Sequence, residues 1–242
     1  MTASPRYPHV SLSVVIPAYN EEGNIESTIP RAVEALRRQV GMFEIILIDD
    51  KSKDRTLEIS RALAERYAEI TVIANERNLR QGGTLKKGFA LARHEYVTHN
   101  AMDYPFDFDD LPLLLEHVPR ADVVVGGRIT YPGVYGLRKF VSWSNRALLS
   151  LLFEANIKDY NFIQIYKRSV LQSQPSFSQA TSFITPEKII RAHHAGLRVV
   201  EVDVEYHRRV VGTPSSANFR NVKQALGDMA RLWLELKRSP RR

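Results

Sequence analysis

Four aspartates lie close together in the stretch Tyr96–Asp110, which reads YVTHNAMDYPFDFDD. They are Asp103, Asp107, Asp109 and Asp110. Carboxylate oxygens suit Mg²⁺ and Mn²⁺, so the stretch is a candidate metal site. Asp103 follows an apolar run, whereas the other three precede LPLLLEHV and are better explained as a turn and a helix cap. We therefore expect only Asp103 of this group at a binding site.

The elements that would position Asp103 can be identified from hydrophobic spacing. Apolar runs with strand character alternate with segments of helical spacing. The runs are Leu12–Tyr19, Phe43–Asp50, Ile70–Asn75, Glu95–Ala101 and Ala121–Gly127, and the helical segments are Asn20–Gln39, Ser52–Ala68 and Gly82–His94. This alternation predicts an α/β fold with a mainly parallel sheet. Ligands bind such sheets beyond the carboxyl ends of the strands.

The predicted strand ends gather side chains that suit a nucleotide. Carboxylates can accept N–H groups of a base, and glycines and lysines suit phosphates. The residues at these ends are Pro17, Ala18, Tyr19, Asn20, Asp49, Asp50, the segment 78–83 with Gly82, Lys86, Lys87 and Asp103. Neither GxxxxGK[ST] nor a GxGxxG after the first strand occurs. The sequence therefore predicts a nucleotide site of another α/β type.

The composition is that of an ordinary globular protein of 242 residues without cysteine. The length suits one large domain. The lack of cysteine excludes disulfides, a thiolate nucleophile and a cysteine zinc site. The N-terminus has no signal-peptide core, and no apolar run approaches the ~20 residues of a membrane span. We therefore expect a cytoplasmic protein.

The net charge of +7 is concentrated at the C-terminus, because residues 206–242 hold nine Lys or Arg and two acids. In the last segment Val222, Leu226, Met229, Trp233 and Leu236 share one helical face. A basic amphipathic helix of this kind can lie on an anionic membrane, which would place the protein peripherally at the inner face. A helix that packs on its own domain or on a partner in a homodimer has the same pattern and is more common. Nucleic acid is not an expected partner, since no recognised binding module accompanies the charge.

Five stretches, in order, resemble successive motifs of the family 2 glycosyltransferases with the GT-A fold. They read SVVIPAYNEEGNI, EIILIDDKSKDRT, NLRQGGTLKKGFALA, EYVTHNAMDYPFDFDDLP and ADVVVGGR. Each is weak alone, but five in order at the right spacing are a strong signal. Within the family the chain is most similar to the short polyprenyl-phosphate or dolichol-phosphate mannose synthase group. The likeness runs from about Leu12 to Trp233.

The resemblance implies a single GT-A domain over residues 1–242, with a nucleotide-sugar-binding half at about 12–127 and an acceptor-side half at about 128–242. It also implies an inverting transferase that moves a sugar from a nucleotide-diphosphate sugar to a polyprenyl phosphate. A small hydroxyl acceptor is an alternative, as is a protein that binds the nucleotide sugar without turnover.

The resemblance assigns roles to individual residues of the first half. Residues that match Pro17, Tyr19 and Asp50 hold the base and ribose in this family, and Glu21 lies near the same site. Ala18, Gly82, Lys86 and Asp103 complete the set expected to bind the nucleotide sugar. The structural alternatives are that Tyr19 packs on the loop after the second strand and that Asp50 caps the next helix.

The Asp-x-Asp motif of the family is incomplete here. Counting from Tyr96 places its two aspartates at Ala101 and Asp103, so the first carboxylate is missing. Pro105 stands where related synthases have a Gln that can help with the metal. Two alternatives stay open: weak or substrate-dependent binding of Mg²⁺ or Mn²⁺ at Asp103, or neutralisation of the diphosphate by Arg and Lys without metal.

The acceptor side rests on two segments that match less closely. DYNFIQIYKRSVL places Asp159 where the family has an acid, and this residue is the candidate base for a hydroxyl acceptor, with Glu187 second. An ion pair of Asp159 with Arg168 or Lys158 is the structural alternative. The segment that ends in RVVGTPS places Arg209 against the diphosphate or the acceptor phosphate.

Overall fold

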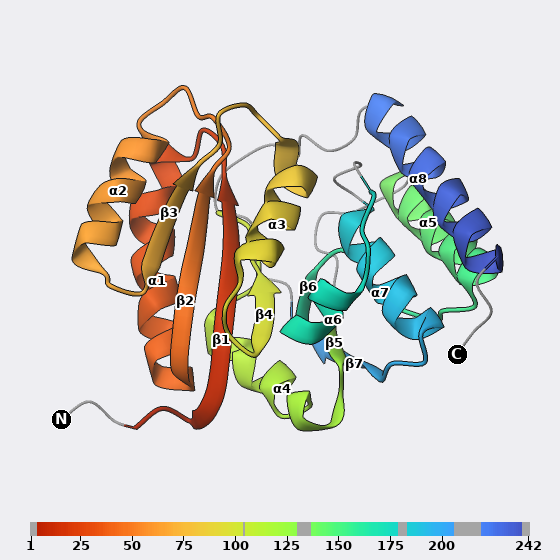
Figure 1. The fold of residues 1–242 in the computed structure, drawn as a ribbon, viewed down its shortest axis with the longest axis horizontal. Helices are drawn as coiled ribbons and strands as arrows, with labels where there is room; N and C mark the ends of the chain where they lie inside the picture. The colour runs from red at the N-terminus through yellow and green to blue at the C-terminus, as the bar shows by residue number, and fades with distance from the viewer. Residues whose placement is uncertain (1–3, 104, 130–136, 179–182, 206–218, 239–242) are drawn as a thin grey trace.

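A seven-stranded sheet forms the centre of the computed structural model, which describes residues 4–103, 105–129, 137–178, 183–205 and 219–238 (Figure 1). The strand order is β3-β2-β1-β4-β6-β5-β7. The strands are β1 (Tyr7–Ala18), β2 (Val40–Asp49), β3 (Ile70–Ala74), β4 (Tyr96–His99), β5 (Val123–Arg128), β6 (Ile163–Lys167) and β7 (Val199–Val204). The helices are α1 (Glu22–Gln39), α2 (Thr56–Arg66), α3 (Arg80–Leu91), α4 (Leu111–Leu115), α5 (Leu137–Phe153), α6 (Arg168–Ser173), α7 (Ile184–His194) and α8 (Phe219–Arg238), with short 3-10 turns η1 (Phe108–Asp110) and η2 (Val118–Arg120).

The sheet is mixed but mainly parallel, as predicted. β1 runs parallel to β2 and β4, β2 parallel to β3, and β5 parallel to β7. β6 is antiparallel to both of its neighbours, β4 and β5. β6, from the second half of the chain, lies between β4 and β5 of the first half, so segments of both halves share one sheet.

Helices cover both faces of the sheet, because side chains alternate along each buried strand. Val14 and Ile16 of β1 belong to a core cluster with α1, α2 and α4. Val15, between them, belongs to a second cluster with α3, α5, α6, α7 and α8. A Cβ on Gly88 would lie 2.2 Å from Val15 Cγ1, so glycine at this position lets α3 lie directly on β1.

The predicted boundaries differ from the observed ones at several ends. β1 begins at Tyr7, well before the expected Leu12. α2 begins at Thr56 instead of the expected Ser52, and Asp54 Oδ1 accepts a hydrogen bond from the Thr56 N–H at 3.1 Å. The expected turn after Asp103 is confirmed, because Asp107 is the N-cap of η1 and accepts from the Asp109 N–H at 3.1 Å.

Candidate active site

The carboxyl ends of β1, β2 and β3 are in register, so that the loops that follow them meet at one edge of the sheet. The N–H of Asp50 donates to the Ala18 carbonyl at 2.8 Å, and the N–H of Asn75 donates to the Asp49 carbonyl at 2.8 Å. Pro17 pairs with Ile48 in the same parallel ladder. The structure thus brings these strand ends together, as the sequence predicts.

Asp50 organises the polar contacts at this edge. Asp50 is only 3% exposed. Its Oδ1 accepts hydrogen bonds from Asn75 Nδ2 and from the Leu79 N–H, each at 2.8 Å. Leu79 is the N-cap of α3, so Asp50 holds the start of α3; the alternative that it caps the next helix, α2, is wrong. Two fixed donors hold the carboxylate in one orientation, which is what a positioned binding group requires.

The loops after β1 and β2 bind each other through reciprocal hydrogen bonds. The Asn20 N–H donates to Ser52 Oγ at 3.0 Å, and Asn20 Oδ1 accepts from the Lys53 N–H at 2.9 Å. The Glu21 N–H donates to Thr56 Oγ1 at 2.8 Å. Asn20 and Lys51 both have positive φ, 55° and 66°, a region that costs a non-glycine residue about 1 kcal/mol or more. Such strain is common at binding sites, because the surrounding contacts can hold it there.

Tyr19 stands at the end of β1 with 45% of its surface exposed, the largest exposed ring of the described strand ends. More than half of the residue is covered and the rest is open, so both packing on the neighbouring loop and contact with a ligand stay predictions for Tyr19. An exposed aromatic face next to a fixed carboxylate is suited to stacking on a nucleobase.

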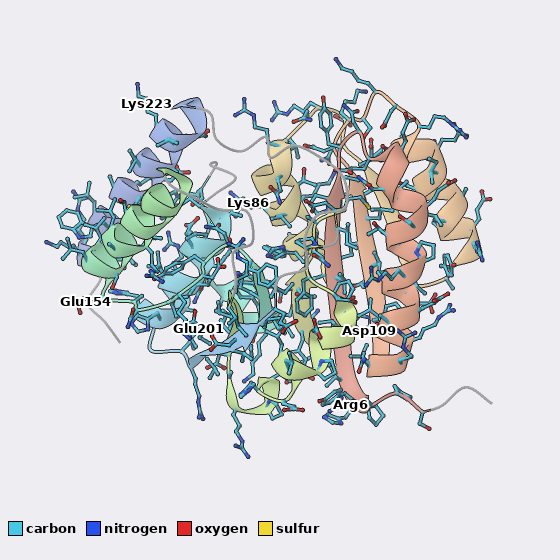
Figure 2. All side chains as sticks on the ribbon, turned by 180° about the vertical axis from the view of Figure 1, so that it is seen from behind. Arg6, Lys86, Asp109, Glu154, Glu201 and Lys223 are labelled. Atoms are coloured by element: carbon cyan, nitrogen blue, oxygen red, sulfur yellow. The ribbon has the colours of Figure 1, made fainter. Side chains whose placement is uncertain are left out.

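The two lysines of α3, Lys86 and Lys87, point to different parts of the molecule. Lys87 Nζ donates to Asn75 Oδ1 at 2.7 Å and so joins the contacts around Asp50. Lys86 Nζ donates instead to the Ser176 carbonyl at 2.8 Å and lies between α3 and the half of the molecule that holds α7 (Figure 2). The predicted role of Lys86 at the nucleotide sugar stays a prediction, whereas Lys87 is the lysine that the structure places with the strand-end residues. Gly82 is buried in the first turn of α3.

The loop after β4 carries the incomplete Asp-x-Asp motif. The Met102 carbonyl accepts from Thr28 Oγ1 at 2.9 Å, which ties this loop to α1. In the described residues no group of three or more His, Cys, Asp or Glu is close enough to hold a metal ion. Ala101 and Pro105 bring no side-chain oxygen, so a cation at Asp103 would take its other ligands from substrate phosphates and water.

Hydrogen bonds within the domain account for His99 and Asn100. His99 Nε2 lies 2.9 Å from Gln164 Oε1, and burial lowers the pKa of the imidazole, so the ring stays neutral. Asn100 Nδ2 donates to the Phe106 carbonyl at 2.8 Å. Both residues shape the base of the loop that carries Asp103.

Asp159 forms an ion pair with Arg128, which the sequence analysis did not anticipate. Arg128 Nε lies 2.5 Å from Asp159 Oδ2, and Nη2 lies 3.2 Å from Oδ1. The alternative pairing with Arg168 or Lys158 is wrong, since Lys158 Nζ binds Asp203. The only sequence signal for Arg128 was its place directly after the strand in ADVVVGGR, because the end of a parallel strand is where ligand-binding residues occur.

Glu187 is held in the interior by hydrogen bonds and an ion pair. It is fully buried, and its carboxylate accepts from Ser176 Oγ, from the Ser178 N–H and from Arg191 Nε. Burial alone would raise its pKa, but hydrogen bonds from Ser178, Arg191 and Ser176 lower it overall. A carboxylate that is saturated in this way cannot take a proton from a substrate, so its expected role as second candidate base is not supported. Arg209, with Gly212 and Ser215, lies outside the described residues.

A family model for glycosyl transferase family 2 matches residues 13–180 of the chain. The chain belongs to this family. The chain is 29% identical over 215 residues to an undecaprenyl-phosphate 4-deoxy-4-formamido-L-arabinose transferase of Pseudomonas paraeruginosa. It is 27% identical over 231 residues to a dodecaprenyl-phosphate galacturonate synthase of Rhizobium johnstonii. These matches cover 85% and 91% of the chain, but only 60% and 67% of the relatives, so the chain spans about two thirds of their length.

Solved structures confirm the GT-A fold of the chain. Glucosyl-3-phosphoglycerate synthase of Mycobacterium tuberculosis, solved with Mn²⁺, uridine diphosphate and phosphoglyceric acid, superposes with a TM-score of 0.70 at 21% identity. The match covers 93% of this chain and 79% of that one. The same synthase was also solved with Mg²⁺ and uridine diphosphate, with a TM-score of 0.70. At this identity the likeness shows the fold of the transferase.

Proposed function

We propose that the chain moves a sugar, with inversion, from a nucleotide-diphosphate sugar to a polyprenyl phosphate. The observation that carries the proposal is the fixed Asp50 carboxylate beside the exposed Tyr19 ring at the aligned strand ends of a family 2 fold. Relatives that act on undecaprenyl and dodecaprenyl phosphate support the class of acceptor.

The donor would lie across the carboxyl ends of β1, β2 and β4. Tyr19 stacks on the base, and Asp50, with Pro17, Ala18 and Glu21 around it, accepts N–H or O–H groups of the nucleoside. Gly82, at the start of α3, lets the backbone approach the phosphates, and Lys87 supplies positive charge next to Asp50. Asp103 reaches the sugar-diphosphate end.

A divalent cation, where present, would be held by Asp103 and the donor diphosphate. It would supply positive charge against the leaving group. Since Ala101 contributes no ligand, more of that charge must come from cationic side chains, and we assign this role to Arg209. The mannose synthases with a full Asp-x-Asp would then depend more strongly on metal than this chain.

In the reaction an oxygen of the acceptor attacks the anomeric carbon, and the bond from that carbon to the diphosphate oxygen breaks. The leaving nucleoside diphosphate takes the electron pair. A phosphate acceptor is already anionic near neutral pH and needs no base, whereas a hydroxyl must lose a proton. Both oxygens of Asp159 accept from Arg128, and this ion pair competes with any proton that Asp159 would take as a base. This contact favours the phosphate acceptor over the hydroxyl alternative, with Arg128 and Asp159 as positioning residues.

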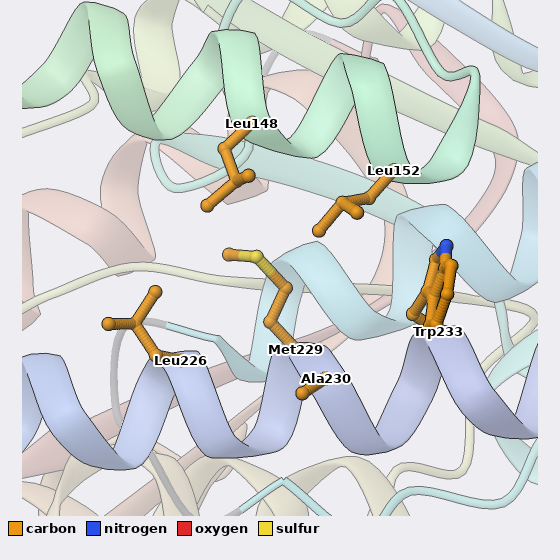
Figure 3. A pocket seen from close by; sticks show the side chains of 6 residues that line it. All are labelled: Leu148, Leu152, Leu226, Met229, Ala230 and Trp233. Atoms are coloured by element: carbon orange, nitrogen blue, oxygen red, sulfur yellow. The ribbon is translucent and has the colours of Figure 1, made fainter.

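We further propose that the face formed by α5 and α8 contacts the membrane that carries the lipid acceptor. None of the described helices is both long and apolar enough to span a bilayer. A groove between the two helices is lined only by apolar side chains (Figure 3): Leu148, Leu152, Leu226, Met229, Ala230 and Trp233. Leu151 beside it is 79% exposed. α8 carries the cations Lys223, Arg231, Lys237 and Arg238 and the acids Asp228 and Glu235, and Glu235 is bound to Arg191. The net positive charge of the helix suits an anionic lipid surface.

The function is tested by transfer of radiolabelled sugar to undecaprenyl phosphate and by thermal stabilisation with uridine or guanosine diphosphate. Asp50→Asn keeps an oxygen for the Leu79 N–H but removes the charge. We expect it to weaken nucleotide binding at least tenfold and to abolish transfer. Asp109→Asn, which removes a surface carboxylate bound to Arg38, is the matched control. Unchanged nucleotide affinity in Asp50→Asn would remove Asp50 from the site, and nucleotide binding without transfer or hydrolysis would favour the binding-only alternative.

A further inference from the structure

A cavity of about 350 Å³ separates α3 from α6 and α7. It is lined by Lys86, Phe89, Ala90, Leu171, Gln172, Ser176 and Lys188. Two of these residues carry an ammonium group, and no acidic residue lines the cavity. Lys86 comes from α3 and Lys188 from α7, so the two charges are brought together by the fold and not by the sequence.

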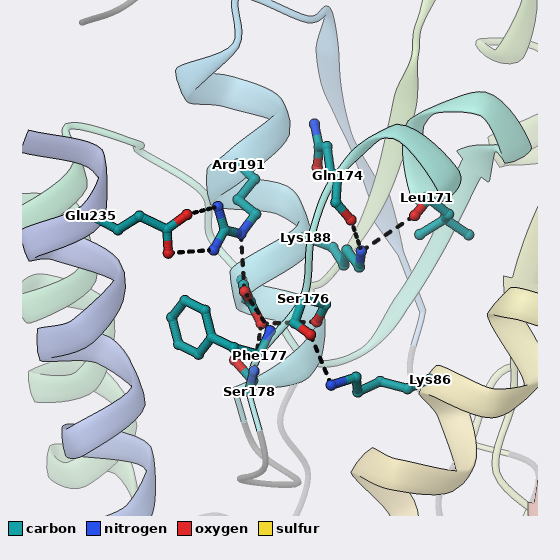
Figure 4. A network of polar contacts seen from close by, with 10 residues as sticks. Lys86, Leu171, Gln174, Ser176, Phe177, Ser178, Lys188, Arg191 and Glu235 are labelled. Atoms are coloured by element: carbon teal, nitrogen blue, oxygen red, sulfur yellow. Dashed lines mark hydrogen bonds and ion pairs between the residues drawn. The ribbon is translucent and has the colours of Figure 1, made fainter. Parts of the chain in front are cut away.

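Lys188 is an unusual lysine because it is buried, with 4% of its surface exposed. Its Nζ donates to the Gln174 carbonyl at 2.9 Å and to the Leu171 carbonyl at 3.4 Å (Figure 4). Both acceptors are neutral. Moving an ammonium out of water is costly, and neutral carbonyls compensate for this cost less well than an anion does.

The neighbouring carboxylates are engaged elsewhere. Glu187, one residue before Lys188, is bound by Arg191 Nε at 2.9 Å and by two backbone N–H groups. Glu235 is bound by both terminal nitrogens of Arg191, at 2.8 and 3.0 Å. Figure 4 shows this network beside Lys188, and no dashed line joins its ammonium to a carboxylate of the residues drawn. Neither acid is hydrogen-bonded to Lys188, although the charge of Glu187 favours the ammonium form.

Both ammonium groups keep hydrogen-bond capacity for a ligand. An ammonium has three N–H donors; in the described residues Lys188 uses two of them on carbonyls and Lys86 uses one, on the Ser176 carbonyl at 2.8 Å. Ser176 Oγ lies on the same wall and donates to Glu187. An anion in the cavity could accept from both lysines, while Phe89, Ala90 and Leu171 provide an apolar wall.

We propose that Lys86 and Lys188 form a binding site for a phosphate group, separate from the contacts around Asp50. A phosphate has enough oxygens to accept from two ammonium groups, and its charge offsets the cost of burying Lys188. The phosphate could come from inorganic phosphate or from a lipid phosphate, whose first isoprene units would meet the apolar wall. The proposal does not depend on the assignment of the donor site.

Calorimetric titrations with inorganic phosphate and with farnesyl phosphate test the site, in phosphate-free buffer at pH 7. We expect at least tenfold weaker binding in Lys188→Met and in Lys86→Met. Lys158→Met, which removes a lysine paired with Asp203 on the surface, should bind as the wild type does. Tighter binding of farnesyl phosphate than of inorganic phosphate identifies the lipid as the source, and the reverse order identifies the free ion.

Two results would overturn the inference. The first is equal phosphate affinity in the wild type, Lys86→Met and Lys188→Met. The second is a Lys86→Met variant that loses uridine diphosphate but keeps phosphate, since Lys86 would then belong to the donor site. If Lys188→Met does not fold, Lys86→Met still decides the matter, because Lys86 is partly exposed. Asp50→Asn should lose the nucleotide and keep phosphate, so failure of the proposed function and failure of this site give different results.

Discussion

Ala101 is the residue at which this chain differs most informatively from its family pattern. The β4–η1 loop keeps Asp103, and its backbone is tied to α1 through Thr28 and Met102. We expect Ala101→Asp to tighten Mn²⁺ binding in the presence of a nucleoside diphosphate, because it restores a carboxylate ligand. Isothermal titration of Mn²⁺ into both proteins measures the difference, with about tenfold tighter binding expected.

Two outcomes of that titration would contradict the expectation. If the wild type binds Mn²⁺ as tightly as Ala101→Asp does, another group has replaced the missing carboxylate ligand. Binding in neither protein would mean that the loop no longer forms the site at all. Asp103→Asn provides the control, since it should weaken binding in both backgrounds.

Lys188 should make stability depend on pH. Burial first, and then the nearby charges of Arg191 and Lys86, lower its pKa from 10.5 to about 8, although Glu187 acts in the opposite direction. Between these two values the unfolded chain holds a proton that the folded chain has lost, so stability rises with pH there. Below about pH 8 Lys188 is protonated in both the folded and the unfolded chain. The cost of burying its charge then lowers the stability of the fold by the full amount.

We therefore expect the free energy of unfolding, relative to Lys188→Met, to rise by on the order of 2 kcal/mol from pH 8 to pH 10. Urea denaturation in phosphate-free buffer at several pH values measures it. If the difference in free energy of unfolding between the wild type and Lys188→Met does not change with pH, Lys188 titrates normally. Added phosphate should raise the free energy of unfolding of the wild type most at pH 7, where the Lys188 ammonium is charged.

At the scale of elements, α8 has two faces with different partners. Met229 and Leu232 are buried against the domain, and Glu235 binds Arg191 of α7. Leu226 and Leu234 are about half exposed, and Lys237 Nζ lies 4.0 Å from the Trp233 ring centre. The expectation that the helix packs on its own domain is thus confirmed, and its exposed face stays available for a further contact.

Vesicle flotation tests whether that contact is a bilayer. We expect the chain to bind vesicles that contain anionic lipid and not to bind neutral vesicles. Binding should be lost as the salt concentration is raised. Leu226→Ser with Leu234→Ser should weaken binding severalfold and leave uridine diphosphate binding unchanged. Leu113→Ser, an exposed leucine on α4, is the matched control. A concentration-dependent dimer in light scattering, with no vesicle binding, would show instead that a second copy covers this face.

The sequence predicted elements well where hydrophobic spacing is local. The first three strands and helices, and the grouping of Asp50 with the end of β1, follow from alternation and from the rule that parallel strands end at one edge. Lys86 could not be separated from Lys87 in this way, because neighbours on a helix differ by about 100° in direction and the true orientation depends on packing. The Arg128–Asp159 pair was also missed, since a contact between residues on either side of α5 leaves no local pattern.

At the scale of the whole molecule, β5 joins the halves that the motifs suggest. In sequence it ends the nucleotide-sugar half, yet in the sheet it pairs with β6 and β7 from the acceptor half. The halves therefore share one sheet, and we expect one cooperative unfolding transition. Both tryptophans lie in α5 and α8, so fluorescence follows the second half, while far-ultraviolet circular dichroism follows the whole chain. Midpoints in urea that differ between the two signals would show that the halves unfold separately.

The place of β6 also bears on how the chain emerges from the ribosome. β3, β2, β1 and β4 can pair as soon as residue 99 is available, but β4 then exposes its other edge until Ile163–Lys167 has been made. An open strand edge can pair with another chain. During synthesis of the intervening residues the nascent protein is thus open to aggregation, and chaperone dependence should be greatest for chains that stop between β4 and β6.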